Sequence, residues 1–169
     1  MLGILSLALL GTAAAPPHTC ESLAALRLPQ TTITSAVVVP AGPFVQPGGG
    51  RGRQGTAPEA VEPIPEHCRV KMVLKPTPDS NINAELWMPM ANWNGRFLAV
   101  GNGGFAGSIQ GYGDMQIALR RGYATAATDT GHSDVDGPGG MLGLGHPEKI
   151  VDFAYRPVHE MTGKSKQLV

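Results

Sequence analysis

The pattern of apolar and polar positions predicts four strands in the first hundred residues. Thr31–Val39 is rich in β-branched side chains, which favour the pleated backbone of a strand. Residues 68–75 and 82–88 alternate apolar and polar side chains around a polar turn at 76–81, a pattern typical of an antiparallel hairpin. Phe97–Val100 is short and wholly apolar, which is typical of a strand covered on both faces.

The second half of the chain predicts helices alternating with a strand. A helix with one apolar face is expected at residues 111–121 and a strand at 123–128, so that with the preceding apolar strand they form a parallel β–α–β unit. After a loop at 133–145, Pro147 suits the first turn of a helix whose apolar residues recur at helical spacing. Pro157 should kink or divide that helix. These elements predict an α/β fold with a mixed, mostly parallel sheet that starts with a β-hairpin.

Length and charge narrow the class of protein. The chain has 169 residues, which suits one domain or part of a larger one, and its 13 basic and 13 acidic residues give a net charge of +0. This balance gives no reason to expect nucleic acid or an acidic membrane surface as a partner. Residues 2–10 are an apolar run followed by small residues, which resembles a signal peptide and is too short to span a bilayer. We therefore expect export, with a signal peptide at 1–15 and the folded domain at 16–169. A buried strand or a wrongly assigned start of the chain also fits the apolar run.

The cysteines fit the same compartment. Cys20 and Cys68 are the two cysteines of the chain, and in an exported protein such a pair is most simply one disulfide. Two free buried thiols also fit the sequence. His18 and His67 stand near these cysteines and are expected at the surface. The sequence has no Cys-x-x-Cys motif and no Cys/His cluster, so it predicts no metal site.

A glycine-rich segment, Gly-Asn-Gly-Gly at residues 101–104, directly follows the apolar strand. Glycine accepts positive φ and has no Cβ, so successive backbone N–H groups can point at one negatively charged group. Three interpretations fit: an oxyanion hole, a nucleotide phosphate loop, and a tight turn without a ligand. The match to a dinucleotide-binding fingerprint is poor, because Ala106 replaces the third glycine and Asp129 lies too far along the chain.

The sequence offers no convincing catalytic nucleophile. Residues 131–135 (Gly-His-Ser-Asp-Val) come nearest to the G-x-S-x-G elbow, but valine replaces the second glycine. Adjacent Ser133, His132 and Asp134 cannot align as a triad, because consecutive side chains do not place histidine between the other two. Ser108 also lacks the elbow pattern. His132 follows a parallel strand at its carboxyl end, where it would contact substrate or hold the loop by hydrogen bonds.

Five motifs occur in order along the chain: NWNGRF at residues 92–97, GNGGFAG at 101–107, TDTGH at 128–132, PEKIVDFAYR at 147–156 and VHEMT at 158–162. Together they resemble the tannase and feruloyl esterase family of α/β-hydrolases, from about residue 20 onward. The resemblance implies a secreted or periplasmic serine esterase that cleaves esters of aromatic or phenolic acids through an acyl-enzyme. It also implies that Gly103 and Gly104 contribute to the oxyanion hole and that Cys20 and Cys68 form the family's N-terminal disulfide.

The sequence departs from the family pattern at its end. The family nucleophile stands in a Cys-Ser-x-Gly-Gly motif that would follow the helix ending near Val169, and its aspartate, its histidine and a lid with a calcium site come later still. None of these occurs among the 169 residues. We therefore expect the N-terminal part of an α/β-hydrolase fold, without a catalytic triad or cofactor of its own and inactive alone. The alternatives are a non-catalytic remnant and an α/β module that binds a small ligand or nucleotide.

Overall fold

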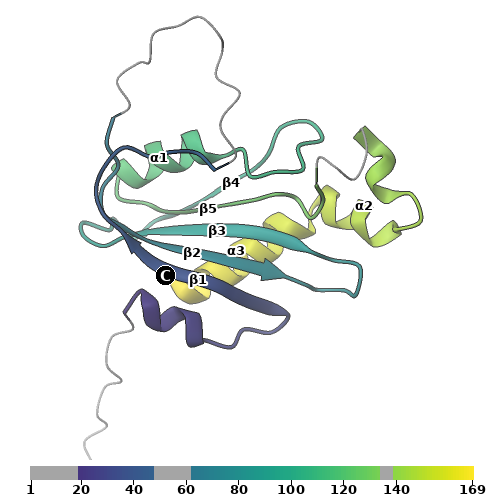
Figure 1. Ribbon diagram of the computed structural model, residues 1–169, viewed down its shortest axis with the longest axis horizontal. Coiled ribbons are helices and arrows are strands. Elements are labelled where there is room, and N and C mark those ends of the chain that lie inside the picture. The colour runs from purple at the N-terminus through teal and green to yellow at the C-terminus, as the bar shows by residue number, and fades with distance from the viewer. Residues whose placement is uncertain (1–18, 48–61, 134–138) are drawn as a thin grey trace, which may run out of the picture.

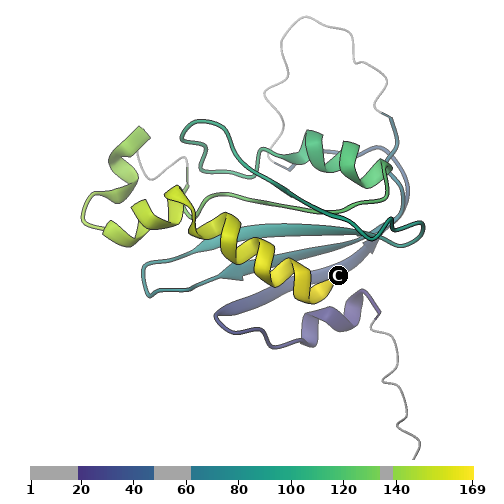
Figure 2. The same ribbon diagram turned by 180° about the vertical axis from the view of Figure 1, so that it is seen from behind.

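The computed structural model describes residues 19–47, 62–133 and 139–169. Five strands form one sheet with helices packed on both faces (Figure 1 and Figure 2). The strands are β1 (Thr31–Val39), β2 (His67–Leu74), β3 (Ile82–Pro89), β4 (Phe97–Val100) and β5 (Ala124–Thr128). The helices are α1 (Tyr112–Arg120), α2 (Pro147–Ala154) and α3 (Arg156–Leu168), with short 3₁₀ helices η1 (Glu21–Ala25) and η2 (Gly139–Gly143).

The sheet is mixed, with strand order β1-β2-β3-β5-β4. The predicted hairpin is confirmed as β2 and β3, which pair antiparallel in a continuous register. The predicted parallel unit is also confirmed, since β4 and β5 pair in parallel through α1. The expectation of a mostly parallel sheet is wrong for the described residues: β1–β2, β2–β3 and β3–β5 are antiparallel, and only β4–β5 is parallel. Short turns can join only antiparallel neighbours, and a single crossover helix supplies a single parallel pair.

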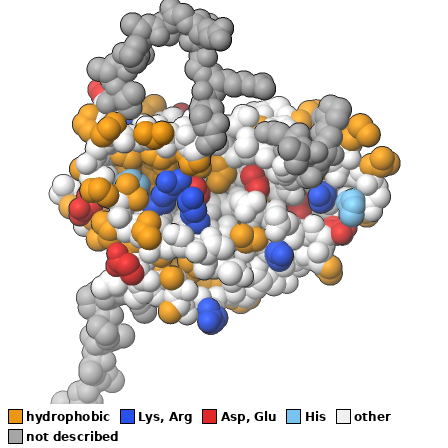
Figure 3. Space-filling view, in the orientation of Figure 1, with side chains coloured by type: hydrophobic (Ala, Val, Ile, Leu, Met, Phe, Trp, Pro, Cys, Tyr) orange, Lys and Arg blue, Asp and Glu red, His pale blue; other side chains and the backbone are white. Residues whose placement is uncertain are grey.

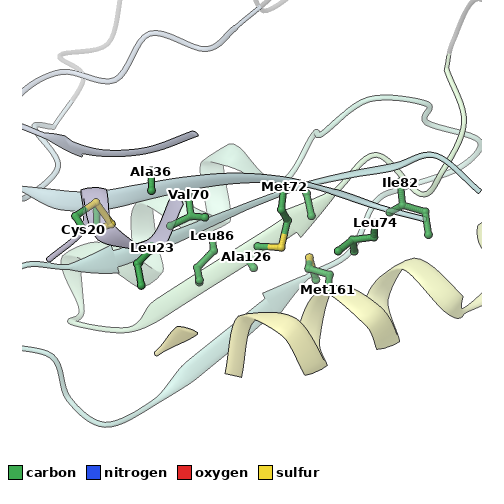
Figure 4. Packing of buried hydrophobic residues seen from close by; sticks show 12 residues of the cluster. Cys20, Leu23, Ala36, Val70, Met72, Leu74, Ile82, Leu86, Ala126 and Met161 are labelled. Carbon is green, nitrogen blue, oxygen red and sulfur yellow. A yellow bond between two sulfur atoms is a disulfide. The ribbon is translucent and has the colours of Figure 1, made fainter. Parts of the chain in front are cut away.

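The two faces of the sheet are covered by different helices. Leu86 and Ala126 belong to one buried cluster with Met161 of α3, on the face that Figure 4 shows. Trp87 and Ala127, the next residues of β3 and β5, belong to a second buried cluster under α1. Side chains alternate between faces along a strand, so both strands are covered on both sides. Every position of β5 is buried, as expected for a strand between two helix layers.

Strand β4 differs from this pattern. We expected it to be covered on both faces, but Leu98 is 40% exposed. The physical reason is position: in the part of the chain that the structure describes, β4 lies at the edge of the sheet with β5 as its one neighbour. An apolar strand therefore stands at an open edge.

The helix predicted after Pro147 is divided, as expected from Pro157. Helix α2 ends at Ala154 and α3 begins at Arg156, with Tyr155 at φ −158° and ψ −30° between them. Pro157 occupies the first turn of α3, where its missing N–H leaves no hydrogen bond unmade. The chain thus changes direction between the two helices (Figure 2).

The disulfide between Cys20 and Cys68 is present and joins the N-terminal turn to β2. The expectation that His67 is exposed is wrong, since its side chain is fully buried. Its Nδ1 lies 3.0 Å from the Pro65 carbonyl oxygen and its ring packs against Trp87. The alternation of β2 places this residue on the covered face under α1. His18 and the signal peptide predicted at 1–15 lie outside the described residues.

The surface of the described residues is mixed in character. Figure 3 shows acidic and basic side chains interspersed on one face, with apolar side chains gathered toward the left of that view. Among the described residues, no helix has the length and apolar character needed to cross a membrane.

Candidate functional site

Two loops meet where the carboxyl ends of β4 and β5 lie side by side, beside α2 at the right of Figure 1. Residues 101–111 follow β4 and residues 129–133 follow β5. Because the carboxyl ends of parallel strands point to the same edge, both loops converge where ligands bind in open α/β sheets. The structure therefore brings together Gly103, Gly104 and His132, the three site residues predicted from the sequence.

Asn102 anchors the beginning of the first loop. Its Nδ2 donates to the carbonyl oxygen of Thr128 at 2.9 Å and to that of Ser108 at 3.0 Å. The side chain therefore ties the loop after β4 both to the end of β5 and to its own returning segment. Sequence reasoning treated this asparagine only as part of a glycine-rich run. The sequence did contain a signal for this role, because asparagine side chains commonly form hydrogen bonds with backbone groups in turns.

The turn at Gly103 and Gly104 is open toward solvent. Gly104 has φ +57°, and a Cβ built on either glycine meets no atom within 4 Å. The turn closes through a hydrogen bond from the Ala106 N–H to the Gly103 carbonyl oxygen at 3.4 Å. Within residues 19–47, 62–133 and 139–169, no atom accepts a hydrogen bond from the N–H of Gly103 or Gly104. Two adjacent, exposed backbone donors thus have no acceptor in this part of the chain at the carboxyl end of β4.

His132 is buried, with 6% of its surface exposed, and both ring nitrogens have partners. Nε2 lies 3.1 Å from the Phe105 carbonyl oxygen, and Nδ1 lies 3.1 Å from Thr130 Oγ1. The same hydroxyl lies 3.1 Å from the carbonyl oxygen of Ala106. Of the two roles that the sequence left open for His132, the structure contains the contacts that hold the loop. The histidine also lines the neighbouring cavity, so the substrate-side prediction stays a prediction.

Asp129 joins the start of β3 to the end of β5. Its Oδ1 accepts hydrogen bonds from the backbone N–H groups of Asn83 at 3.0 Å and Gly131 at 2.9 Å, and Oδ2 accepts one from Asn83 Nδ2 at 2.6 Å. Burial raises the pKa of this carboxyl, while the three hydrogen bonds act in the opposite direction. The carboxylate is thus committed to the backbone, which disfavours the ribose contact of a dinucleotide site.

A cavity of about 610 Å³ lies between the two loops. Its lining includes Asn83, Asp129, His132 and Ser108. Ser108 contributes its carbonyl oxygen to the Asn102 anchor. The imidazole nitrogens of His132 are occupied by Thr130 and Phe105, so the described contacts form no Ser–His–Asp relay at this edge. Asp134, the third member of the adjacent Ser-His-Asp run, lies outside the described residues.

Helix α2 supports the second loop from behind. The Phe153 ring packs edge-on against His132 with centroids 5.5 Å apart, and it stacks on Phe105 at 5.1 Å. Gly131 has φ +79°, and a Cβ there would come within 3.0 Å of the Cβ of Asp152. Glycine is therefore required at this close approach. Asp152 itself is fully buried and pairs with Arg156 at 2.7 Å.

The residues at this edge do not fit a metal ion. Among the described residues, no group of three or more His, Cys, Asp or Glu side chains converges on one point. The calcium in a lid that the family resemblance implies stays a prediction.

Comparison with known proteins identifies the family. The tannase and feruloyl esterase model matches residues 68–169. An uncharacterised esterase from Xanthomonas campestris pv. campestris is 44% identical over 162 residues, which are 96% of this chain and 26% of that protein. Feruloyl esterase B from Aspergillus niger is 41% identical over 109 residues, 64% of this chain and 20% of that protein.

Solved structures agree with the sequence comparison. Feruloyl esterase B from Aspergillus oryzae matches with a TM-score of 0.69 at 33% identity, over 88% of this chain and 28% of that structure. The chain thus spans between a fifth and about a quarter of the curated relatives described above. The predicted fold class, part of an α/β-hydrolase, is confirmed by this match. On the family match and on the shared sequence and fold, the chain belongs to the tannase and feruloyl esterase family.

Proposed function

We propose that this chain forms the first part of a serine-type carboxylic ester hydrolase that cleaves esters of aromatic or phenolic acids. The observation that carries the proposal is the exposed turn at Gly103 and Gly104, whose two N–H groups have no acceptor among the described residues at the carboxyl end of β4. Family membership and the names of the relatives, esterase and feruloyl esterase, support the reaction and the substrate class.

The turn suits the charge that develops in ester hydrolysis. When a nucleophile attacks the ester carbonyl, the carbonyl oxygen becomes negative, and preorganised N–H donors stabilise it. Removing one such donor in an esterase or protease of this type typically lowers kcat by about 100- to 1000-fold. In this chain the Gly103 and Gly104 N–H groups would supply that stabilisation, while the glycines leave room for the substrate to approach.

The nucleophile is proposed to come from sequence after Val169. Helix α3 crosses the face of the sheet beside β5, and a strand after it would return by a right-handed crossover, parallel to β5. The place open to such a strand is the free edge of β4. A serine at the carboxyl end of that strand would stand beside the Gly103–Gly104 turn. This fits the Cys-Ser-x-Gly-Gly motif that the family resemblance implies.

Two measurements test the proposal. The coding sequence after Val169 should contain an in-frame Cys-Ser-x-Gly-Gly motif shortly downstream, and the product that includes it should hydrolyse methyl ferulate or methyl gallate. Residues 1–169 alone should show no turnover of these esters. Hydrolysis by residues 1–169 that is abolished by Ser133→Ala would contradict the proposal and identify Ser133 as the nucleophile. A stop codon directly after Val169 would favour the remnant instead.

We also propose that the protein is secreted or periplasmic. The Cys20–Cys68 disulfide supports this, since such bonds persist in oxidising compartments. Fractionation of the producing cells, with N-terminal sequencing of the mature protein, tests it: a start near residue 16 is expected, and an intact Met1 in the cytosolic fraction would contradict it.

A further inference from the structure

We infer that His132 and Thr130 are positioning residues that set the direction of the Gly103 and Gly104 N–H groups without touching the substrate. The inference rests on the proposed function, because it assigns a role to the same turn. It begins from the contacts of two successive carbonyl groups. The carbonyl oxygen of Phe105 lies 3.1 Å from His132 Nε2, and that of Ala106 lies 3.1 Å from Thr130 Oγ1.

The chemistry of these contacts determines which atom donates. A carbonyl oxygen only accepts, so Nε2 of His132 must carry a hydrogen and donate it to Phe105. The Thr130 hydroxyl has one hydrogen and three neighbours: the carbonyl oxygens of Ala106 and Asp129, and His132 Nδ1. If the hydroxyl donates to Nδ1, the imidazole is neutral. If it donates to a carbonyl, Nδ1 carries a hydrogen and donates to Oγ1. The bond from His132 to Phe105 persists in both cases.

These bonds orient the turn because each peptide unit is planar. Holding the carbonyl of Phe105 holds the whole plane of the Phe105–Ala106 peptide. The Ala106 N–H in that plane closes the turn onto the Gly103 carbonyl oxygen. On the other side, Asn102 is held to Thr128 and Ser108 by its side chain. The two glycines therefore span a short gap between two held ends.

The turn needs such anchors because its two glycines have no side chains that could hold them in place. Both glycines are exposed, and a Cβ at Gly103 or Gly104 would meet no atom within 4 Å. Glycine also has the widest range of backbone conformations. Oxyanion stabilisation depends on donors that already point to the site of charge. A loop with this composition therefore requires restraint from outside, and the loop after β5 supplies it.

The histidine is itself held in place. Its ring lies against Phe153, which also stacks on Phe105. Thr130 adopts φ +63°, an uncommon conformation for a β-branched residue. The backbone at Thr130 is thus kept in a costly shape that directs its hydroxyl at Ala106 and His132. With both nitrogens occupied and 6% exposure, the imidazole has no free nitrogen to act as a general base.

The test uses the active gene product that contains these residues, with methyl ferulate as the substrate. His132→Ala should lower kcat by about 10- to 100-fold, a loss smaller than or equal to that of a missing oxyanion donor, and change KM less than threefold. His132→Gln retains an N–H donor and should restore most of the lost kcat. His159→Ala, a change of an exposed histidine on α3, is the matched control and should leave both constants within twofold.

A second pair of variants covers the case in which His132→Ala does not fold. Thr130→Val removes the hydroxyl at nearly the same volume and should lower kcat by about tenfold, whereas Thr130→Ser should recover most of it. Amide hydrogen exchange at residues 103–106 should be faster in the Val variant than in the Ser variant, which shows that the turn itself has loosened.

Three outcomes would overturn the inference. Equal kcat in wild type and His132→Ala would show that the hydrogen bond from His132 to Phe105 does not affect catalysis. Complete loss in both His132→Ala and His132→Gln, with unchanged exchange at 103–106 in the Thr130 variants, would assign His132 to the reacting atoms instead. A wild-type protein that hydrolyses none of these esters would contradict the proposed function itself. The present inference, which rests on that function, would then fail as well.

Discussion

The antiparallel half of the sheet (β1, β2 and β3) and the parallel half (β4 and β5) differ in how completely the chain covers them. In the antiparallel half, Leu86 of β3 is fully buried between neighbouring strands and α3. In the parallel half, Leu98 of β4 is 40% exposed at an open edge. Both residues are leucines on strands of one sheet. Their difference therefore reflects topology and not composition.

The contrast follows from how strands of each kind are connected. A tight turn can join two antiparallel neighbours, as residues 75–81 join β2 and β3. A parallel neighbour requires a crossover of a dozen residues or more. Strand β4 pairs with β5 through the crossover helix α1, and the strand that we propose after α3 would pair with the other edge of β4. The half of the sheet that carries the candidate site is thus the half whose strands are joined by a crossover.

The largest expected effect is on the antiparallel half. Replacing both Cys20 and Cys68 by serine removes a link across 48 residues. On the chain-entropy account this should lower the free energy of unfolding by about 4 kcal/mol. Urea unfolding of the oxidised protein and of the double variant measures the difference. The matched control is the wild type unfolded in reducing agent, which should agree with the variant. Equal midpoints for oxidised and reduced protein would contradict a stabilising link.

The second prediction compares the two leucines directly. Leu86→Ala leaves a cavity between packed layers and should cost about 3 kcal/mol. Leu98→Ala removes a partly exposed side chain at the edge and should cost less than about 1 kcal/mol. Each is measured by urea unfolding of residues 1–169 under oxidising conditions. Equal losses would show that Leu98 is covered in solution, and the contrast between the halves would then fail.

Much of the local structure could be predicted from the sequence. The strand at Thr31–Val39, the hairpin and the helix break at Pro157 each follow from a period or a breaker that acts on the nearby backbone. The prediction of a mostly parallel sheet was wrong because an apolar run indicates that a strand is buried and does not indicate the direction of its neighbours. Phe97–Val100 looked doubly covered for the same reason. Its apolar side chains indicate covering that the described residues supply only in part, since Val100 is buried whereas Leu98 is 40% exposed.

The candidate site divides in a similar way. Gly103 and Gly104 were found because glycine after a strand has a direct backbone consequence. The hydrogen bonds of Asn102, Thr130 and His132 were not predicted in detail, because each joins a side chain to a carbonyl brought near by the fold. No periodicity encodes such a contact. His67 was misplaced because its neighbours in sequence suggested a surface, while the alternation of β2 placed it inside.

The third prediction concerns this buried histidine of the antiparallel half. Burial lowers the pKa of His67 below the ordinary histidine value of about 6.5, although the hydrogen bond to Pro65 partly offsets this. His67 Nε2 is buried without a partner among the described residues, so protonation would place a charge there unsolvated. The unfolded chain therefore takes up this proton at a higher pH than the folded chain does. Stability should be full above pH 6.5 and fall as the pH is lowered from there to the folded-state pKa.

One histidine can change the free energy of unfolding by at most about 1.4 kcal/mol per pH unit. The His67→Asn variant keeps a donor for the Pro65 carbonyl but has no titratable group at this position. It should therefore be less stable than wild type at neutral pH, and its free energy of unfolding should fall less on acidification. Urea unfolding of both proteins between pH 7.5 and 5.5 gives the difference in slope. The other titratable groups are the same in both proteins and cancel in that comparison. Identical slopes would mean that His67 is accessible to protons in the folded chain, and the antiparallel half would then be less closed than its packing indicates.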